Sequence, residues 1–283
     1  MPKATSRPSH GSDVHGSRVR VGCLDFDSHS LDEAARYIID LGHQRQPSIV
    51  VTPNTDILRL CTQDVSLRQI VDRAALVLPD GWPVVLASKL SAPTTLLGGS
   101  LSSRVPGSDL MWQVCAAADE HQLPVAIVGG GPDTAQKAAS RLRERFPSLL
   151  ITSHEIGPVS SRRSAAIAAC AQALIASDAR VVLVGMGFPK QELLAEELQR
   201  AGVQACFIGI GAGVDFAAGT KPRAPQLMRE LGLEWTHRLV IEPKRLWRRY
   251  LIHDLPFALK LLARSASNRV RTLPSRTSRS KAS

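Results

Sequence analysis

The sequence lacks the long apolar runs that a membrane protein needs. None of its stretches reaches the roughly 18 uncharged apolar residues of a membrane-spanning helix. The first thirty residues also lack the apolar segment of a secretory signal peptide. We therefore expect a protein that is made and kept in the cytoplasm.

Cysteine is scarce and shows no pairing pattern. The five cysteines are widely spaced and include no Cys-x-x-Cys pair, so disulfides and a cysteine-bound zinc are both disfavoured. The eight histidines form no His-x-x-x-His pair, and no Gly-x-Ser-x-Gly motif of a serine hydrolase is present. The sequence accordingly predicts no metal and no cofactor. The cysteines are Cys23, Cys61, Cys115, Cys170 and Cys206.

What is present is the composition of one folded core with basic ends. Hydrophobic residues make up 44% of the 283 residues, which disfavours a disordered, collagenous or coiled-coil chain. Residues 21–219 carry 16 basic and 20 acidic side chains, whereas residues 220–283 carry 15 basic and four acidic ones. The net charge of +10 therefore comes from the ends of the chain.

Short β-branched runs alternate with longer segments of helical period after Val21. This alternation predicts an α/β fold, a Rossmann-like parallel sheet covered by helices on both faces. The expected strands are Ser48–Thr52, Ala75–Leu78, Val125–Val128, Leu149–Thr152, Arg180–Val184 and Ala205–Ile208. The expected helices are Leu31–Leu41, Thr55–Ile70, Trp82–Leu90, Ser108–His121, Asp133–Phe146, Arg162–Ser177, Lys190–Ala201 and Arg223–Leu231.

The ends of the chain differ in amino-acid composition from this core, which we place at residues 21–233. Residues 1–20 hold almost no large apolar side chain and predict a disordered leader. Residues 234–263 form a basic amphipathic segment, here called the appendage, in which aromatic residues alternate with arginines. Residues 264–283 are rich in Ser and Arg and predict a flexible tail.

The arginines of the appendage admit three interpretations. A basic segment bordered by aromatic side chains can bind an anionic membrane surface, at about 1 kcal/mol for each Lys or Arg. A solvated helix face above a core stripe fits equally well. A nucleic-acid surface is disfavoured by the acidic core and by the absence of a known binding module. We expect anionic lipid or a diphosphate ligand, and no nucleic acid.

Five loops that follow predicted strands carry unusual residues. Ligands of an open parallel sheet bind beyond the carboxyl ends of its strands, so these loops are the candidate site. Three of them are rich in glycine and leave backbone N–H groups that can donate to a nucleotide phosphate. Glycines that only form tight turns are the alternative for any one loop. The five loops are Thr52–Asp56, Pro79–Pro83, Gly129–Asp133, Gly185–Glu192 and Gly209–Asp215.

Asp80 is the candidate for chemistry. A carboxylate at the end of a buried apolar run has little water around it, so its pKa can suit a general base. Asp-Gly is also a common turn, and Asp80 could instead cap the helix that begins near Trp82. The same alternative applies to Thr52 and Asn54, since Asn54 could be an N-cap.

Asp25-Phe26-Asp27 has the Asp-x-Asp spacing with which many nucleotide-sugar enzymes hold a divalent cation. Here it precedes the first predicted helix instead of following a core strand. A turn with Asp27 or Ser30 as the helix cap is therefore favoured over a metal site, which stays open.

Taken in order, these loops and the appendage resemble the WecG/TagA/CpsF family of bacterial glycosyltransferases. The resemblance runs from about Asp25 to Leu251, and the order and compatible spacing of its elements make it specific. The matching elements are Thr52-Pro53-Asn54, Leu78-Pro79-Asp80-Gly81, Arg104–Leu110, Gly185–Glu192, Gly211–Gly219 with Arg223-Ala224-Pro225, Glu234-Trp235 with Arg238, and Glu242-Pro243 with Arg245 and Arg249-Tyr250.

The resemblance implies an inverting transferase that moves a hexose-type sugar (glucose, N-acetylmannosamine or its uronate) from a UDP-sugar to a polyprenyl-diphosphate-linked sugar. It implies peripheral attachment to the inner face of the plasma membrane, a place in surface or exopolysaccharide biosynthesis, and self-association off the membrane. It makes Asp80 the catalytic base. The residues implied to bind substrate are Thr52, Asn54, Arg104, Gln191, Arg238, Arg245 and Arg249. The residues predicted to bind the nucleotide are Gly129, Gly130, Gly185, Gly187, Lys190, Gly209, Gly211 and Asp215.

Departures from the family pattern bear on the choice of sugar. Trp82-Pro83 replaces smaller residues after Asp-Gly, Val214 stands where an aromatic residue is frequent, and Gln226-Leu227 replaces a frequent tryptophan. The Asp-Gly-x-Pro form is closer to members that transfer glucose in exopolysaccharide assembly. Two other classes stay as alternatives: a Rossmann-type oxidoreductase, whose Gly-x-Gly-x-x-Gly turn is missing, and a non-catalytic membrane-surface scaffold.

Overall fold

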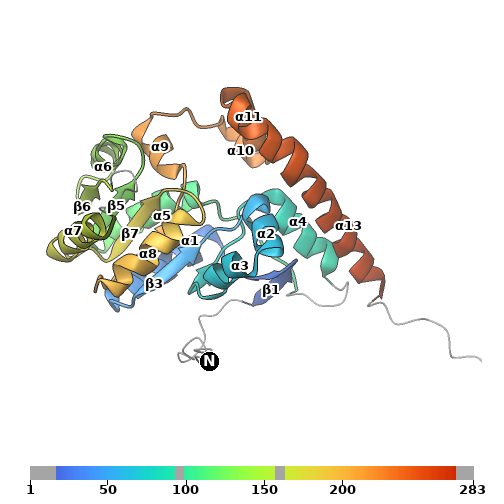
Figure 1. Ribbon diagram of the computed structural model, residues 1–283, viewed down its shortest axis with the longest axis horizontal. Coiled ribbons are helices and arrows are strands. Elements are labelled where there is room, and N and C mark those ends of the chain that lie inside the picture. Colours follow the sequence, from blue (N-terminus) through green and yellow to red (C-terminus); the bar gives the residue numbers. More distant parts are fainter. Residues whose placement is uncertain (1–16, 93–98, 157–162, 272–283) are drawn as a thin grey trace, which may run out of the picture.

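A sheet of six parallel strands forms the centre of the computed structural model, which describes residues 17–92, 99–156 and 163–271 (Figure 1). Neighbouring strands follow the order β4-β3-β8-β7-β5-β6. Each strand overlaps a predicted one, and the predicted Rossmann-like α/β fold is confirmed. The strands are β3 (Ser48–Val51), β4 (Leu76–Val77), β5 (Val125–Gly129), β6 (Ile151–His154), β7 (Val181–Gly185) and β8 (Cys206–Gly209).

The core helices match the predicted ranges with one break. The predicted helix Thr55–Ile70 is two helices, because Asp64 takes an extended conformation and its side chain accepts a hydrogen bond from Ser66 N at 2.8 Å. The segment Gly213–Ala218, which overlaps a predicted loop, is also helical. The helices are α1 (Leu31–His43), α2 (Thr55–Gln63), α3 (Val65–Asp72), α4 (Trp82–Ser91), α5 (Gly107–Glu120), α6 (Thr134–Arg145), α7 (Arg163–Ala176), α8 (Lys190–Arg200), α9 (Gly213–Ala218) and α10 (Gln226–Glu230).

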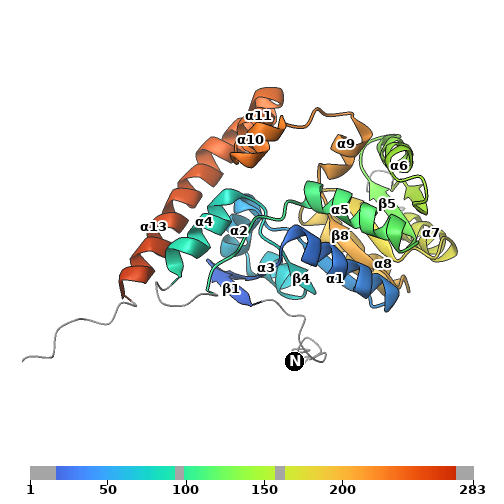
Figure 2. The same cartoon turned by 180° about the vertical axis from the view of Figure 1, so that it is seen from behind.

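Helices cover both faces of the sheet because successive strand residues point to opposite sides. In β5, Val125 and Ile127 pack with side chains of α1, α5 and α6, whereas Ala126 and Val128 pack with those of α7 and α8. Figure 2, seen from behind, shows α1 and α5 in front of the sheet, and Figure 1 shows α8 on the other face. Apart from the edge strand β6, which is half-buried after Ile151, the strands are buried on both faces, which accounts for their apolar runs.

A two-stranded antiparallel hairpin of β1 (Arg18–Val21) and β2 (Leu24–Asp27) precedes the core. Its alternate residues Val19 and Val21 are buried, so this hairpin closes one end of the core. Composition assigns residues 18–20 to the leader, yet their pairing with β2 places them in the folded part. Residues 1–16 lie outside the described residues.

The appendage is helical and lies against the core. It consists of α11 (Glu234–Ile241), α12 (Pro243–Trp247), a π-helical segment η1 (Arg248–Asp254) and the start of α13 (Leu255–Arg271). Helix α13 packs along α4, as Figure 1 shows, and buries Leu261 there. It continues through residues 264–271, which composition assigns to the tail, while residues 272–283 lie outside the described part. No described helix is long and apolar enough to cross a bilayer.

Candidate active site

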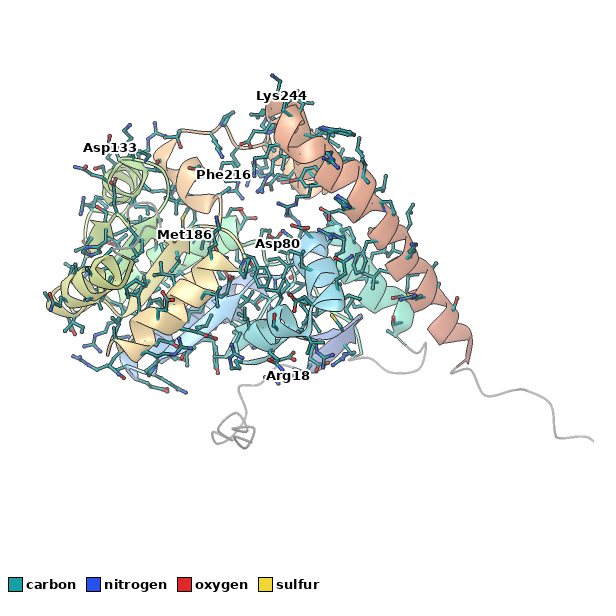
Figure 3. The ribbon with its side chains drawn as sticks, viewed as in Figure 1. Arg18, Asp80, Asp133, Met186, Phe216 and Lys244 are labelled. Carbon is teal, nitrogen blue, oxygen red and sulfur yellow. The ribbon has the colours of Figure 1, made fainter. Side chains whose placement is uncertain are left out.

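The polar loops after β3 and β4 meet at the carboxyl end of the sheet. Thr52 and Asn54 follow β3, and Asp80 follows β4, its parallel neighbour. The backbone N–H of Asp80 donates to the carbonyl oxygen of Pro53 at 3.1 Å, so the two loops are joined. Figure 3 shows Asp80 between this end of the sheet and the appendage. The topology therefore brings these three candidate residues together.

Two cavities meet at Asp80. The first, of about 260 Å³, extends toward α4 and the appendage, and we call it the aromatic cavity. Its walls include Trp82, Pro83, Trp235, Tyr250 and Leu255. The second, of about 340 Å³, lies over the ends of β3, β7 and β8, and we call it the glycine-loop cavity. Its walls include Gly187, Gly209, Gly211, Lys221 and Arg245. Asn54, Asp56, Asp80, Arg238, Arg249 and Tyr250 line both.

Asp80 does not cap the helix that follows it, so that alternative is wrong. Gly81, whose φ of 112° favours glycine, precedes α4, and no side chain caps this helix. Burial raises the pKa of Asp80 from 3.8 to about 6, against the opposing effect of Arg238 and with the added effect of Glu234. A carboxyl group with this pKa is ionised at neutral pH and is basic enough to accept a proton.

Arg238 reaches the shared part of the two cavities from α11. Its guanidinium group forms an ion pair with Glu234, one turn earlier in the same helix. It also lies 5.0 Å from the ring centroid of Phe216 on α9, labelled in Figure 3. A cation above an aromatic face is attracted to it, and this contact holds α11 of the appendage against the core.

Arg104 and Arg245 line different cavities. Arg104 lines the aromatic cavity and donates to the carbonyl oxygen of Arg229 at 2.7 Å, which ties the core to α10. Arg245 lines the glycine-loop cavity and forms an ion pair with Glu242. Both guanidinium groups keep further N–H donors for a ligand, because each has five.

A half-buried ion network joins the appendage to α2. Arg59 on α2 lies 2.5 Å from Asp56 and 3.2 Å from Asp254 of η1. Arg249, also of η1, lies 2.9 Å from Asp56. Burial and the neighbouring Asp56 raise the pKa of Asp254. Asp56 and Arg249 thus serve the docking of the appendage while they line both cavities.

Asn54 is both a helix cap and a cavity residue. Its side-chain oxygen accepts a hydrogen bond from Ile57 N at 3.1 Å, which confirms the alternative that Asn54 caps α2. Thr52 is buried in the wall of the glycine-loop cavity. A Cβ atom at Gly107 would lie 3.0 Å from the Thr52 hydroxyl, so α5 begins in close contact with it.

The Gln191 side chain joins the two glycine loops. Its amide oxygen accepts from the backbone N–H of Gly187 at 3.0 Å and of Gly211 at 3.1 Å. Its amide nitrogen donates at 2.8 Å to Glu192, a buried carboxyl group whose pKa is raised to about 7 by burial. In this conformation the backbone N–H groups of Gly187 and Gly211 are therefore hydrogen-bonded to Gln191 and do not point to a phosphate site. Gly209 lies so close that a Cβ atom there would be 2.2 Å from the Gln191 amide nitrogen.

The other residues predicted to bind the nucleotide line neither cavity. Gly130 N donates to Gly185 O at 3.0 Å, and a Cβ atom at Gly185 would lie 2.3 Å from Val214. These glycines permit close packing of neighbouring loops. The remaining three are Gly129, whose Cβ atom would meet Met186 at 2.8 Å, Lys190, which is exposed at the start of α8, and Asp215, which lies 3.2 Å from Lys221.

Several cavity residues were not among the predicted ones. Glu234, Lys221, Tyr250 and Trp82 all contribute to the walls. Trp82 lies in the predicted loop Pro79–Pro83, and Glu234 and Tyr250 lie in the family elements. Glu234 also stands four residues before Arg238, the spacing of a helical ion pair. Lys221 has no such signal and reaches the site through tertiary contacts.

Asp25 and Asp27 lie away from both cavities. Asp27 is buried and accepts from Val77 N at 2.8 Å and from Arg18 at 2.9 Å, while Asp25 pairs with Arg20. Ser30 caps α1, as one alternative expected. Across residues 17–92, 99–156 and 163–271, no group of three or more His, Cys, Asp and Glu side chains is arranged to hold a metal ion.

Comparison with known families agrees with this geometry. The model of the family described as "Glycosyl transferase WecG/TagA/CpsF family" matches residues 19–271. The match covers the hairpin from Val19 onward, the whole six-stranded sheet and the appendage, including every residue that lines the two cavities.

Proposed function

The chain belongs to the WecG/TagA/CpsF family of glycosyltransferases, and from this premise we propose that it moves a hexose-type sugar from a UDP-sugar to a polyprenyl-diphosphate-linked sugar. The observation that carries the proposal is the position of Asp80, a carboxyl group of raised pKa where two cavities meet beside Arg238. A two-substrate transfer needs a base at such a junction.

In the proposed reaction Asp80 takes the proton of the acceptor hydroxyl. The oxygen of that hydroxyl forms a bond to the anomeric carbon of the donor sugar, and the bond from this carbon to the diphosphate breaks. The electron pair of the broken bond leaves with UDP, and attack from the opposite side inverts the anomeric carbon. Asp80 later returns the proton to solvent.

The leaving diphosphate needs positive charge, and the glycine-loop cavity supplies it. Arg245 and Lys221 line this cavity alone, and Arg238 lies where it joins the aromatic cavity. Arg245 and Lys221 both pair with Glu242, and each keeps a further N–H donor that can stabilise the negative charge developing on the diphosphate. We place the UDP-sugar in this cavity, with the Gln191 loops around it.

The surface of the appendage supports attachment to a membrane. Exposed apolar side chains are interspersed there with the exposed cations Lys244, Arg245, Arg248 and Lys260, which is the composition of a segment that lies in a bilayer interface. We propose that this face binds the inner leaflet of the plasma membrane, where the lipid-linked acceptor is found. The exposed apolar residues of the appendage that line neither cavity are Val240, Trp247, Leu251, Ile252 and Leu259.

Asp80→Asn tests the proposal, with Asp72→Asn as the matched control. Asp72 is exposed on α3, pairs with Arg68 and lines neither cavity. In an assay of label transfer from a UDP-sugar to a short-chain polyprenyl-diphosphate sugar, Asp80→Asn should lower kcat by about 10²–10⁴-fold. UDP affinity, measured by calorimetry, should stay within about twofold because Asp80 carries no phosphate contact in this scheme.

Three outcomes contradict the proposal. Full turnover by Asp80→Asn removes Asp80 from the role of base. Binding of NAD in place of UDP by the wild-type protein favours the oxidoreductase, and binding of neither favours the non-catalytic scaffold.

A further inference from the structure

Trp82 is a large aromatic side chain that remains open to the aromatic cavity. It is the first residue of α4, two positions after Asp80, and 41% of its surface is exposed. It lines the aromatic cavity and not the glycine-loop cavity. The side chain thus presents exposed aromatic surface to the cavity.

The position of the Trp82 indole is fixed by its neighbours. Gly232 has a φ of 72°, and a Cβ atom there would lie 1.9 Å from Cδ1 of the indole. The edge of the indole therefore packs on the backbone of Gly232, which only glycine allows. Trp235 and Tyr250 complete the wall, with rings edge to face and centroids 6.2 Å apart. A platform held in place before a ligand binds loses little entropy on binding.

The acceptor has to enter from the aromatic cavity if the donor lies in the glycine-loop cavity. In an inverting displacement the attacking hydroxyl and the leaving group lie on opposite faces of the donor sugar. Asp80 lines both cavities, and Lys221 and Arg245, which suit the diphosphate, line only the glycine-loop cavity. The aromatic cavity is the remaining approach to the same carboxyl group.

The walls of the aromatic cavity fit a sugar ring better than a polyprenyl chain. A sugar has apolar C–H faces and a rim of hydroxyl groups, so it suits an aromatic face with charged groups at its edge. Glu234 and Arg104 supply such groups in the wall of the same cavity. A polyprenyl chain in this cavity would have no polar group to bind these charged side chains. Leu255 at the rim and Leu259 beyond it, both exposed on α13, are better placed for that chain.

We propose that Trp82 is the platform on which the acceptor sugar lies, and that it thereby sets which acceptor the enzyme uses. This inference rests on the proposed function of the site. It assigns acceptor recognition to a residue of α4 and leaves donor recognition to the glycine loops. Trp82 is a specificity-determining residue, and it takes no part in proton transfer.

The test compares the full-length wild-type protein with Trp82→Leu, Trp82→Phe and a control, Trp112→Phe. Trp112 packs on Phe146 and lines neither cavity. Acceptor KM and donor KM are measured with one UDP-sugar and with acceptors that carry the same sugar on short and long polyprenyl chains. Trp82→Leu should raise the acceptor KM by about tenfold, the upper end for loss of one aromatic contact.

The remaining readouts separate a platform from a structural role. The donor KM of Trp82→Leu should stay within about twofold of wild type. Trp82→Phe keeps an aromatic face and should recover most of the acceptor affinity. Trp112→Phe should change neither KM. The effect of Trp82→Leu should be the same for short and long chains, because the sugar is the group that Trp82 contacts. If Trp82→Leu does not fold, Trp82→Ala takes its place.

The inference is overturned by an unchanged acceptor KM, by an equal rise in donor KM, or by an effect that disappears with the short chain, since Trp82 would then contact the lipid. These outcomes require normal transfer by the wild-type protein and leave the proposed function intact. A wild-type protein that transfers no sugar to any acceptor overturns the proposed function and this inference together.

Discussion

The rate of transfer should depend on pH through Asp80, over a range that its burial determines. With a pKa of about 6, roughly nine tenths of this carboxyl group is ionised at pH 7 and roughly one tenth at pH 5. If the ionised form is the base, kcat/KM falls about tenfold between pH 7 and pH 5. A carboxyl group at the ordinary value of 3.8 would lose less than about a tenth of its activity over that range.

Glu234→Gln provides a directional check on this reasoning. The negative charge of Glu234 raises the pKa of Asp80, and Glu234 also pairs with Arg238, which lowers that pKa. Removing the charge frees Arg238 to act on Asp80, so both effects move the acid limb of the profile to lower pH. The assay is kcat/KM from pH 4.5 to 8, with circular dichroism at each pH and Asp72→Asn as the control. A flat profile from pH 5 to 7 in a folded protein, or a limb that moves upward in Glu234→Gln, refutes the reasoning.

Two further predictions concern stability and membrane binding. The folded-state pKa of Asp80, about 6, lies above the ordinary 3.8, so its contribution to stability is present at low pH and is lost as the pH rises through 6. Asp80→Asn should therefore raise the free energy of unfolding in urea at pH 7.5 by at most about 3 kcal/mol, with a smaller gain near pH 4. An equal gain at the two pH values contradicts this prediction. Trp247→Asp with Leu251→Asp should weaken binding to anionic liposomes at least about tenfold, since each exposed apolar side chain contributes about 1.5 kcal/mol or more when buried in lipid. Leu150→Asp, at an equally exposed leucine of the core, is the control, and unchanged sedimentation of the double variant contradicts a membrane face.

Strand and helix positions in the core could be predicted from local patterns. Runs such as Val125–Val128 are buried on both faces, and that burial leaves a continuous apolar signal in the sequence. Because the carboxyl ends of parallel strands lie at the same edge of a sheet, the sequence alone predicted that Thr52, Asn54 and Asp80 lie in one region. The family elements depend on the same short segments.

Local patterns failed where a tertiary contact overrides propensity. Asp64 interrupts a segment of helical period because its side chain caps the next helix. Residues 18–20 have the composition of a polar leader, yet they pair with β2, and the side chain of Val19 is buried against the core. Residues 264–271 look like a basic tail, and they continue the helix that begins against α4.

The glycine loops show the same limit at the site. All three loops are rich in glycine, and each predicts phosphate binding equally well. Only in the folded protein do Gly187 and Gly211 face the glycine-loop cavity, whereas Gly130 and Gly185 pack against neighbouring loops. The bonds from both cavity loops to Gln191 have no counterpart in the spacing of the sequence.

The sequence by itself determined the order of strands and helices, the fold class and the family, because these depend on residues that are close together in the chain. Only the tertiary structure decided that Asp80 lies between two unlike cavities, that Arg238 and Glu234 act on its pKa, and that Trp82 faces one cavity alone. The physical reason is that the site is assembled from strand ends and an appendage far apart in the chain. The burial and the charges around a group depend on this assembly, which no local pattern records.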